Sequence, residues 1–102
     1  EGLVIISMII DFKNRKILSR PEIVSKGLIV STSLDEIMEK VKVLVDDIVR
    51  DNFKKRFFEV SKIKAEIHDQ VLDLLRSITK KNPIIIPTLI DVQEQETMMK
   101  EF

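Results

Sequence analysis

Histidine, cysteine and paired carboxylates carry much of protein chemistry, and this chain offers few of them. His68 is the only histidine, and the 102 residues contain no cysteine, tryptophan or tyrosine. A zinc site needs several such ligands at set spacings, so His68 alone does not predict one. Its nearest acids, Glu66 and Asp69, lie off its own helical face. We interpret His68 as a boundary residue that packs its ring and exposes one nitrogen.

Two pairs of carboxylates, Asp35–Glu36 and Asp46–Asp47, stand next to each other in the sequence. General acid–base chemistry needs carboxylates that converge in a cleft with separated pKa values. The first pair follows Ser33 at capping-box spacing, and the second lies on the polar face of a predicted helix. With two glycines in the chain, there is no Gly-rich phosphate loop either. We therefore expect no catalytic residue, no metal ligand and no enzymatic activity in this chain by itself.

Cationic side chains gather in three places, and aromatic residues flank the middle one. Cations interleaved with aromatics can bind single-stranded RNA. The alternative is that Phe53, Phe57 and Phe58 anchor a connection between helices while the cations stay solvated. A balance of 17 basic against 17 acidic residues favours the alternative. The three clusters are Lys13, Arg15 and Lys16; Lys54, Lys55 and Arg56; and Lys80 and Lys81. The residues of the second and third clusters are the candidate RNA phosphate contacts.

The zero net charge also excludes a strong, non-specific binder of nucleic acid or membrane surface. No apolar stretch approaches the roughly 20 residues that a membrane helix needs. Without cysteine there is no disulfide framework, which fits a cytoplasmic protein. The chain begins at Glu1 rather than Met, so we expect it to be part of a longer protein.

Five segments show the periodicity of strands or helices. The β-branched run 3–10 predicts a strand that is covered on both faces, and therefore central in its sheet. A second strand over 17–24 would complete a hairpin with a basic tip. Apolar residues at helical spacing predict helices over 34–48 and 60–78, with the polar stretch after the first as a connection or a frayed helical turn. A third strand is expected over 84–92.

This β-β-α-α-β order predicts an α/β (α+β) two-layer sandwich. Two antiparallel helices return the chain to the start of the first strand, so the last strand should run parallel to it on its free side. The result is a three-stranded mixed sheet of order 2-1-3, with both helices on one face. Pro21 and Pro87 place the outer strands at the edges or mark bulges. We assign 1–92 to this domain and 93–102 to a polar tail.

The sheet face away from the helices should be apolar, and therefore covered by another domain or subunit. Alternation along the first strand gives two sets of side chains, and either could face outward. The set that contains Ser7 is favoured as the outer one. The candidate assembly face is thus Leu3, Ile5, Ser7 and Ile9, and the other set is Val4, Ile6, Met8 and Ile10.

Three segments together resemble the C-terminal domain of ribonuclease J. They are EGLVI at 1–5, ILSRPEIVSKGLIV at 17–30 and TKKNPIIIPTLIDV at 79–92. The most specific parts are the segment 21–27 and the prolines Pro83 and Pro87. The sequence departs from the family pattern at Arg20, where a glycine is usual, at Leu28, where an aromatic residue is common, and in the divergent stretch 53–60, which lacks the usual tryptophan.

The resemblance implies a non-catalytic module that supports subunit assembly and full activity of a cytoplasmic RNA-degrading enzyme. The parent would cleave RNA endonucleolytically and 5′ to 3′, with zinc bound in a catalytic region outside this chain. Its C-terminal module would pack against that catalytic region and a second subunit, in a homodimer or tetramer. The alternatives are a module that contacts RNA through the basic clusters and an adaptor that recruits other degradation factors through a helix face.

Overall fold

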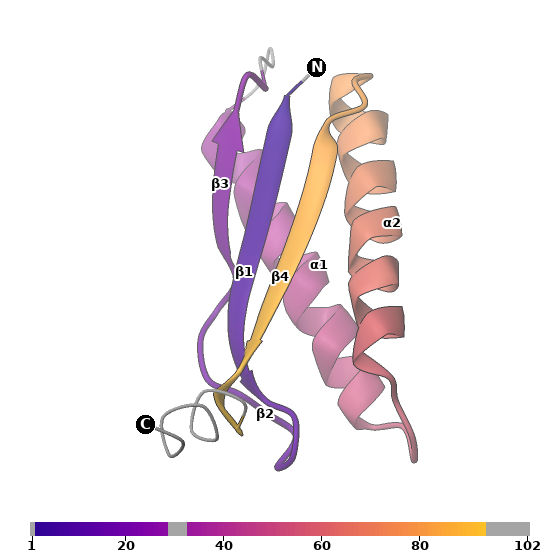
Figure 1. Ribbon diagram of the computed structural model, residues 1–102. Coiled ribbons are helices and arrows are strands. Elements are labelled where there is room, and N and C mark those ends of the chain that lie inside the picture. The colour runs from indigo at the N-terminus through magenta and orange to yellow at the C-terminus, as the bar shows by residue number, and fades with distance from the viewer. Residues whose placement is uncertain (1, 29–32, 94–102) are drawn as a thin grey trace.

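The computed structural model describes residues 2–28 and 33–93, which form one sheet with both helices on the same face (Figure 1). In the view of Figure 1 the sheet lies in front and the helices behind it. The elements are β1 (Leu3–Asp11), β2 (Lys16–Ile17), β3 (Glu22–Lys26), α1 (Leu34–Phe53), α2 (Val60–Thr79) and β4 (Ile84–Asp91).

Strand β1 is the centre of the sheet. It pairs antiparallel with β2 and β3 on one side and parallel with β4 on the other. The predicted sandwich, with the first strand in the middle and the last strand parallel to it, is confirmed. The prediction of three strands is wrong, because the second strand of the hairpin is divided into β2 and β3.

The division lies at residues 18–21. Leu18 N–H still donates to the Ile9 carbonyl, at 2.9 Å, but Ile9 N–H turns to the Ser19 hydroxyl, at 3.0 Å. The buried Pro21 has no N–H to donate. Pairing resumes with Glu22 opposite Ser7, so the hairpin strand bulges outward between its two halves.

The core lies between β1 and the helices. Val4, Ile6, Met8 and Ile10 are at most 1% exposed, which identifies their set as the inner one. The helices bury their apolar stripes against this face, with α1 and α2 antiparallel to each other (Figure 1). The buried stripes are Ile37, Val41, Val45, Ile48 and Val49 on α1, and Ile63, Ile67, Val71 and Leu75 on α2.

Two predictions about helix α1 are corrected. Ser33 is the N-cap residue, but its hydroxyl makes no capping bond, and only its carbonyl accepts a bond, from Ile37 N–H at 3.3 Å. The predicted capping box is therefore wrong. At the other end, α1 continues to Phe53 through the polar stretch. There the buried Asn52 donates its side-chain amide to the Ile48 carbonyl at 2.8 Å, which keeps this polar residue inside the helix.

Of the predicted tail, only Gln93 lies within the described residues, and its side chain donates to Asp11 Oδ1 at 3.3 Å. Residues 29–32, which include the end of the family-like segment 17–30, lie outside the described part of the chain.

We expect Ile67→Ala to lower the free energy of unfolding by about 2–5 kcal/mol, because Ile67 is fully buried and its truncation leaves a cavity. Urea denaturation followed by circular dichroism measures the loss. Lys64→Ala, at an exposed position of the same helix, is the control. Equal stability of the two variants would contradict the packing described above.

Candidate functional site

Two surfaces of the molecule are unusual for a small domain, and the first is the sheet face away from the helices. Leu3, Ile5, Ser7 and Ile9 point to this side, as the alternation with their buried neighbours shows. Ile9 is 44% exposed. The orientation favoured from the sequence is confirmed, and the role of this face in assembly stays a prediction.

The apolar surface continues onto the neighbouring strands. Ile5 is in register with Val24 on one side and Ile86 on the other, and these are 55% and 43% exposed. Ile84, 65% exposed, lies beside Leu3. The outer apolar face, as we call it, comprises Leu3, Ile5, Ile9, Leu18, Val24, Ile84, Ile86 and Ile90.

Sequence reasoning missed the contribution of β4 to this face. The sequence did carry a signal for this contribution, because every second residue of a strand points to the same face. In the stretch 84–90 these residues are Ile84, Ile86, Thr88 and Ile90. Without the register of the parallel pair, however, the sequence could not align the two rows. A polar row formed by Glu22, Ser7 and Thr88 crosses the face and separates a larger apolar part from a smaller one.

The second unusual surface is the end of the molecule where the β1–β2 hairpin meets the α1–α2 connection. The Arg15 guanidinium donates hydrogen bonds to the carbonyls of Phe53 (2.6 Å), Lys55 (2.7 Å) and Arg56 (3.1 Å). These carbonyls lie at and just after the C-terminus of α1, where a helix leaves acceptors without partners and carries partial negative charge. Arg15 therefore fastens two segments that are about forty residues apart in the sequence.

Aromatic packing supports the same junction. Phe12, Phe53 and Phe58 contact one another, with ring centroids 5.4–6.0 Å apart. The Arg15 guanidinium lies 4.8 Å from the centroid of Phe58. The interpretation of Phe53 and Phe58 as anchors is confirmed. Phe57 differs, because it is 79% exposed and contacts the Arg56 guanidinium at 5.4 Å from its ring centroid.

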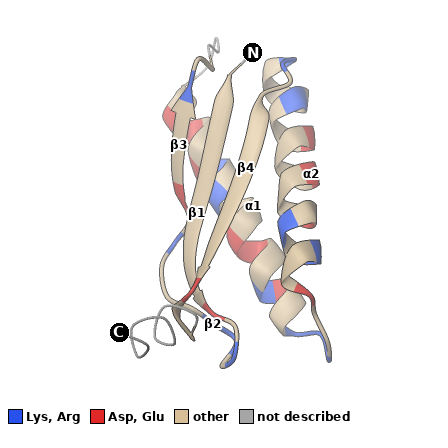
Figure 2. Ribbon diagram, viewed as in Figure 1, with Lys and Arg blue, Asp and Glu red and all other residues tan. Residues whose placement is uncertain are grey.

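The candidate RNA contacts fall at two opposite ends of the molecule (Figure 2). Lys54, Lys55 and Arg56 precede α2, whereas Lys80 and Lys81 follow it, so about 30 Å of helix separates them. The structure instead brings the 54–56 cluster together with the hairpin tip, which the sequence analysis had treated as a separate cluster. No local sequence pattern could reveal this pairing, since it depends on the fold.

Among the described residues, three ionisable groups have shifted pKa values, each because of a neighbour. The Asn14 side-chain amide donates to Asp11 at 2.8 Å and lowers the pKa of that carboxyl below its usual value. A hydrogen bond from Arg20 at 2.6 Å likewise lowers the pKa of Glu39. The hydrogen bond to Asp46 raises the pKa of Arg50. Glu39 and Arg50 are exposed and Asp11 is half-buried, and their contacts fix turns and helix faces.

Histidine chemistry gains no support from the structure. The expectation that Asp69 lies off the face of His68 is wrong, because its carboxylate Oδ1 is 2.9 Å from His68 Nδ1. This pair is adjacent in sequence and exposed. Among the residues described, no three His, Cys, Asp or Glu side chains come together as metal ligands. Within the same residues, neither helix is long and apolar enough to cross a membrane.

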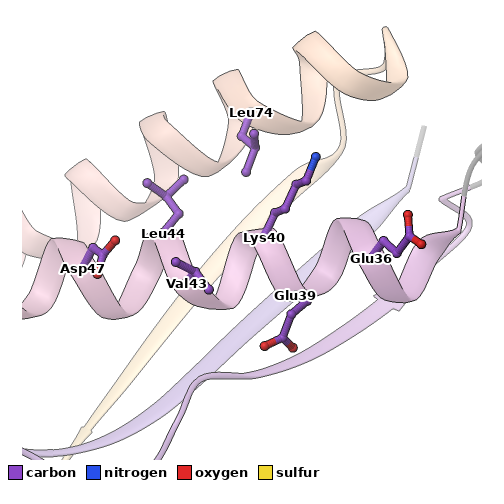
Figure 3. Close-up of a pocket in the computed structure, with 7 residues that line it drawn as sticks. All are labelled: Glu36, Glu39, Lys40, Val43, Leu44, Asp47 and Leu74. Carbon is purple, nitrogen blue, oxygen red and sulfur yellow. The ribbon is translucent and has the colours of Figure 1, made fainter.

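A shallow groove of about 690 Å³ lies between the helices on their solvent side (Figure 3). Leu44 of α1 and Leu74 of α2 form its apolar floor, and Glu39 points away from α2, where Arg20 binds it. This groove is the helix surface that an adaptor function would use. The full lining is Glu36, Glu39, Lys40, Val43, Leu44, Asp47 and Leu74.

The described residues thus form a small two-layer sandwich whose outer sheet face is apolar. The sequence profile of the ribonuclease J C-terminal domain matches residues 1–92, and the chain belongs to this family.

Curated relatives show what this domain is part of. The chain is similar to ribonuclease J 2 of Staphylococcus epidermidis, with 33% identity, and of Staphylococcus aureus, with 32% identity. Each match covers 92 residues, which is 90% of this chain but 16% of the relative. The chain therefore spans about a sixth of the length of these relatives and corresponds to their C-terminal domain.

We expect Arg15→Lys to weaken the junction between the hairpin and the helices, because an ammonium cannot bind three carbonyls and stack on Phe58 at once. The free energy of unfolding should fall by about 1 kcal/mol, which lowers Tm by about 4–8 °C. Thermal unfolding measures this change. Lys13→Gln, at the same exposed tip, is the control and should leave Tm nearly unchanged. If Lys13→Gln lowered Tm as much as Arg15→Lys, the charge of the tip, rather than the Arg15 contacts, would be responsible for the stability.

Proposed function

We propose that this chain is the non-catalytic C-terminal module of a cytoplasmic ribonuclease J-type enzyme, and that it supports subunit assembly and full activity. The observation that carries the proposal is the outer apolar face. Its larger part, around Ile5, Val24 and Ile86, is exposed, and soluble domains rarely leave a group of neighbouring apolar side chains in water unless a partner covers it. The parent is an enzyme that degrades RNA, as the name of its relatives says, and its hydrolytic site lies outside this chain.

The occupant we propose for the outer apolar face is the same face of a second subunit. Val24 is flanked on β3 by Glu22 and Lys26, which point to the same side. In a contact with two-fold symmetry, each residue can meet a different residue of the identical surface. Glu22 of one copy can therefore pair with Lys26 of the other, while the isoleucines are buried between the two sheets.

Assembly through this face would fix the position of the catalytic regions of two subunits relative to each other. The module then acts on activity through geometry, without contributing a reacting group. The zinc that the resemblance implies belongs to the catalytic region in this proposal, since the described residues offer no cluster of ligands that fits it.

The chain should form a dimer whose population rises with concentration, and Ile5→Asp should weaken that dimer at least about 100-fold. The introduced carboxylate would be buried without a partner, which costs several kcal/mol. Sedimentation velocity over a wide concentration range measures the dissociation constant.

Val43→Asp is the matched control, because Val43 is 49% exposed on α1, away from the sheet. Circular dichroism confirms that both variants fold. A chain that stays monomeric at all concentrations, or a dimer that Ile5→Asp and Val43→Asp affect equally, would overturn the assignment of this face to a second subunit.

A further inference from the structure

Basic side chains gather at the end of the molecule where the β1–β2 hairpin meets the α1–α2 connection. The zero net charge of the whole chain does not reveal this local excess. The tip of the β1–β2 hairpin, which contains Lys13 and Lys16, lies at the same end of the molecule as the α1–α2 connection (Figure 2), and Arg15 binds the two segments together. We call this surface the basic end, and it comprises the exposed residues Lys13, Lys16, Lys54, Lys55, Arg56 and Phe57.

The Arg15 contacts are what make these residues one surface. Its guanidinium is occupied by three carbonyls and by the Phe58 ring, so it holds the hairpin against the connection. The side chains on either side of it remain directed to solvent. Two clusters of moderate charge thus become a continuous cationic surface, held by a rigid aromatic core.

Acidic groups near this surface, among them Asp11, Asp51 and Glu59, take part in local contacts. Asp11 accepts hydrogen bonds from Asn14 within the hairpin turn. The ion pair between Lys54 and Asp51 is long, at 3.8 Å, and both side chains are at least 70% exposed. Exposed pairs of this kind contribute little, and a phosphate can replace the carboxylate.

Phe57 adds an aromatic surface to the cations. Its neighbours Phe53 and Phe58 are packed inward, whereas Phe57 leaves 79% of its surface in water. It borders a cleft of about 380 Å³ that Lys55, Phe58 and Lys62 line together with Glu59 and Glu66. A bare ring beside cations suits an unpaired base, which stacks on the ring while its phosphates meet the lysines.

We propose that the basic end binds single-stranded RNA, with phosphates on Lys54, Lys55, Arg56 and the hairpin lysines, and one base stacked on Phe57. The identity of the polyanion as RNA rests on the proposed function, because it comes from the activity of the parent enzyme. The surface is made of residues different from those of the outer apolar face, so the two proposals can fail separately.

Fluorescence anisotropy with a labelled ten-nucleotide uridine RNA, over 50–200 mM KCl, tests the proposal. Affinity should fall with salt with a log–log slope of about −3.5, as expected for five phosphates neutralised by the five cations on a single strand. The triple variant Lys54→Gln/Lys55→Gln/Arg56→Gln should weaken binding at least about 10-fold and reduce the slope to about −1.4, because the two hairpin lysines still neutralise phosphates. Phe57→Ala should weaken binding about 10-fold and leave the slope unchanged.

Lys80→Gln/Lys81→Gln is the control, because it removes two cations from the opposite end of α2, and it should leave RNA affinity within about twofold. An equal loss in this control, or no binding at 50 mM KCl, would overturn the proposal. The proposal would also be overturned if Phe57→Ala left RNA affinity unchanged and heparin or anionic vesicles bound the chain as tightly as RNA. That result would indicate a general polyanion surface. Sedimentation of the same samples reports the dimer independently.

Discussion

The structure depends on a single central strand that carries apolar residues on both faces. Strand β1 buries Val4, Ile6, Met8 and Ile10 against the helices, and its other residues place an apolar row on the opposite face. Its position between β3 and β4 extends that row across the sheet. The single layer of helices covers only one face of the sheet. The need to cover the other side is the physical basis for treating this domain as a part of an assembly.

The second constraint is the junction made by Arg15. A hairpin tip and a helix–helix connection are both loops. Because loops without tertiary contacts are mobile, charged side chains on them do not keep a fixed arrangement. Arg15 and the rings of Phe12, Phe53 and Phe58 give these loops a shared core. The outer apolar face and the basic end therefore rest on different interactions: one on strand register, the other on a cationic side chain bound to the end of α1.

Much of the fold follows from the sequence because its patterns are long and consistent. The apolar run at 3–10 and the two helical stripes determine a central strand and two helices, and Pro83 and Pro87 agree with the start and the edge position of β4. The break in the hairpin was less predictable, since it depends on the Ser19 hydroxyl replacing a backbone partner. The candidate site was predictable only in part. Alternation gave Leu3, Ile5, Ser7 and Ile9, but the contribution of β4 and the meeting of Arg15 with Phe53 require contacts between distant segments.

In the proposed assembly, a second copy of the chain covers the outer apolar face. The most direct test follows isoleucine and valine methyl groups by NMR with a soluble paramagnetic probe, at low and at high chain concentration. The account predicts that methyls of Ile5, Val24 and Ile86 lose their exposure to the probe as concentration rises, while Val43 on α1 keeps it. Sheet methyls that remain as exposed at high concentration as at low concentration would contradict it.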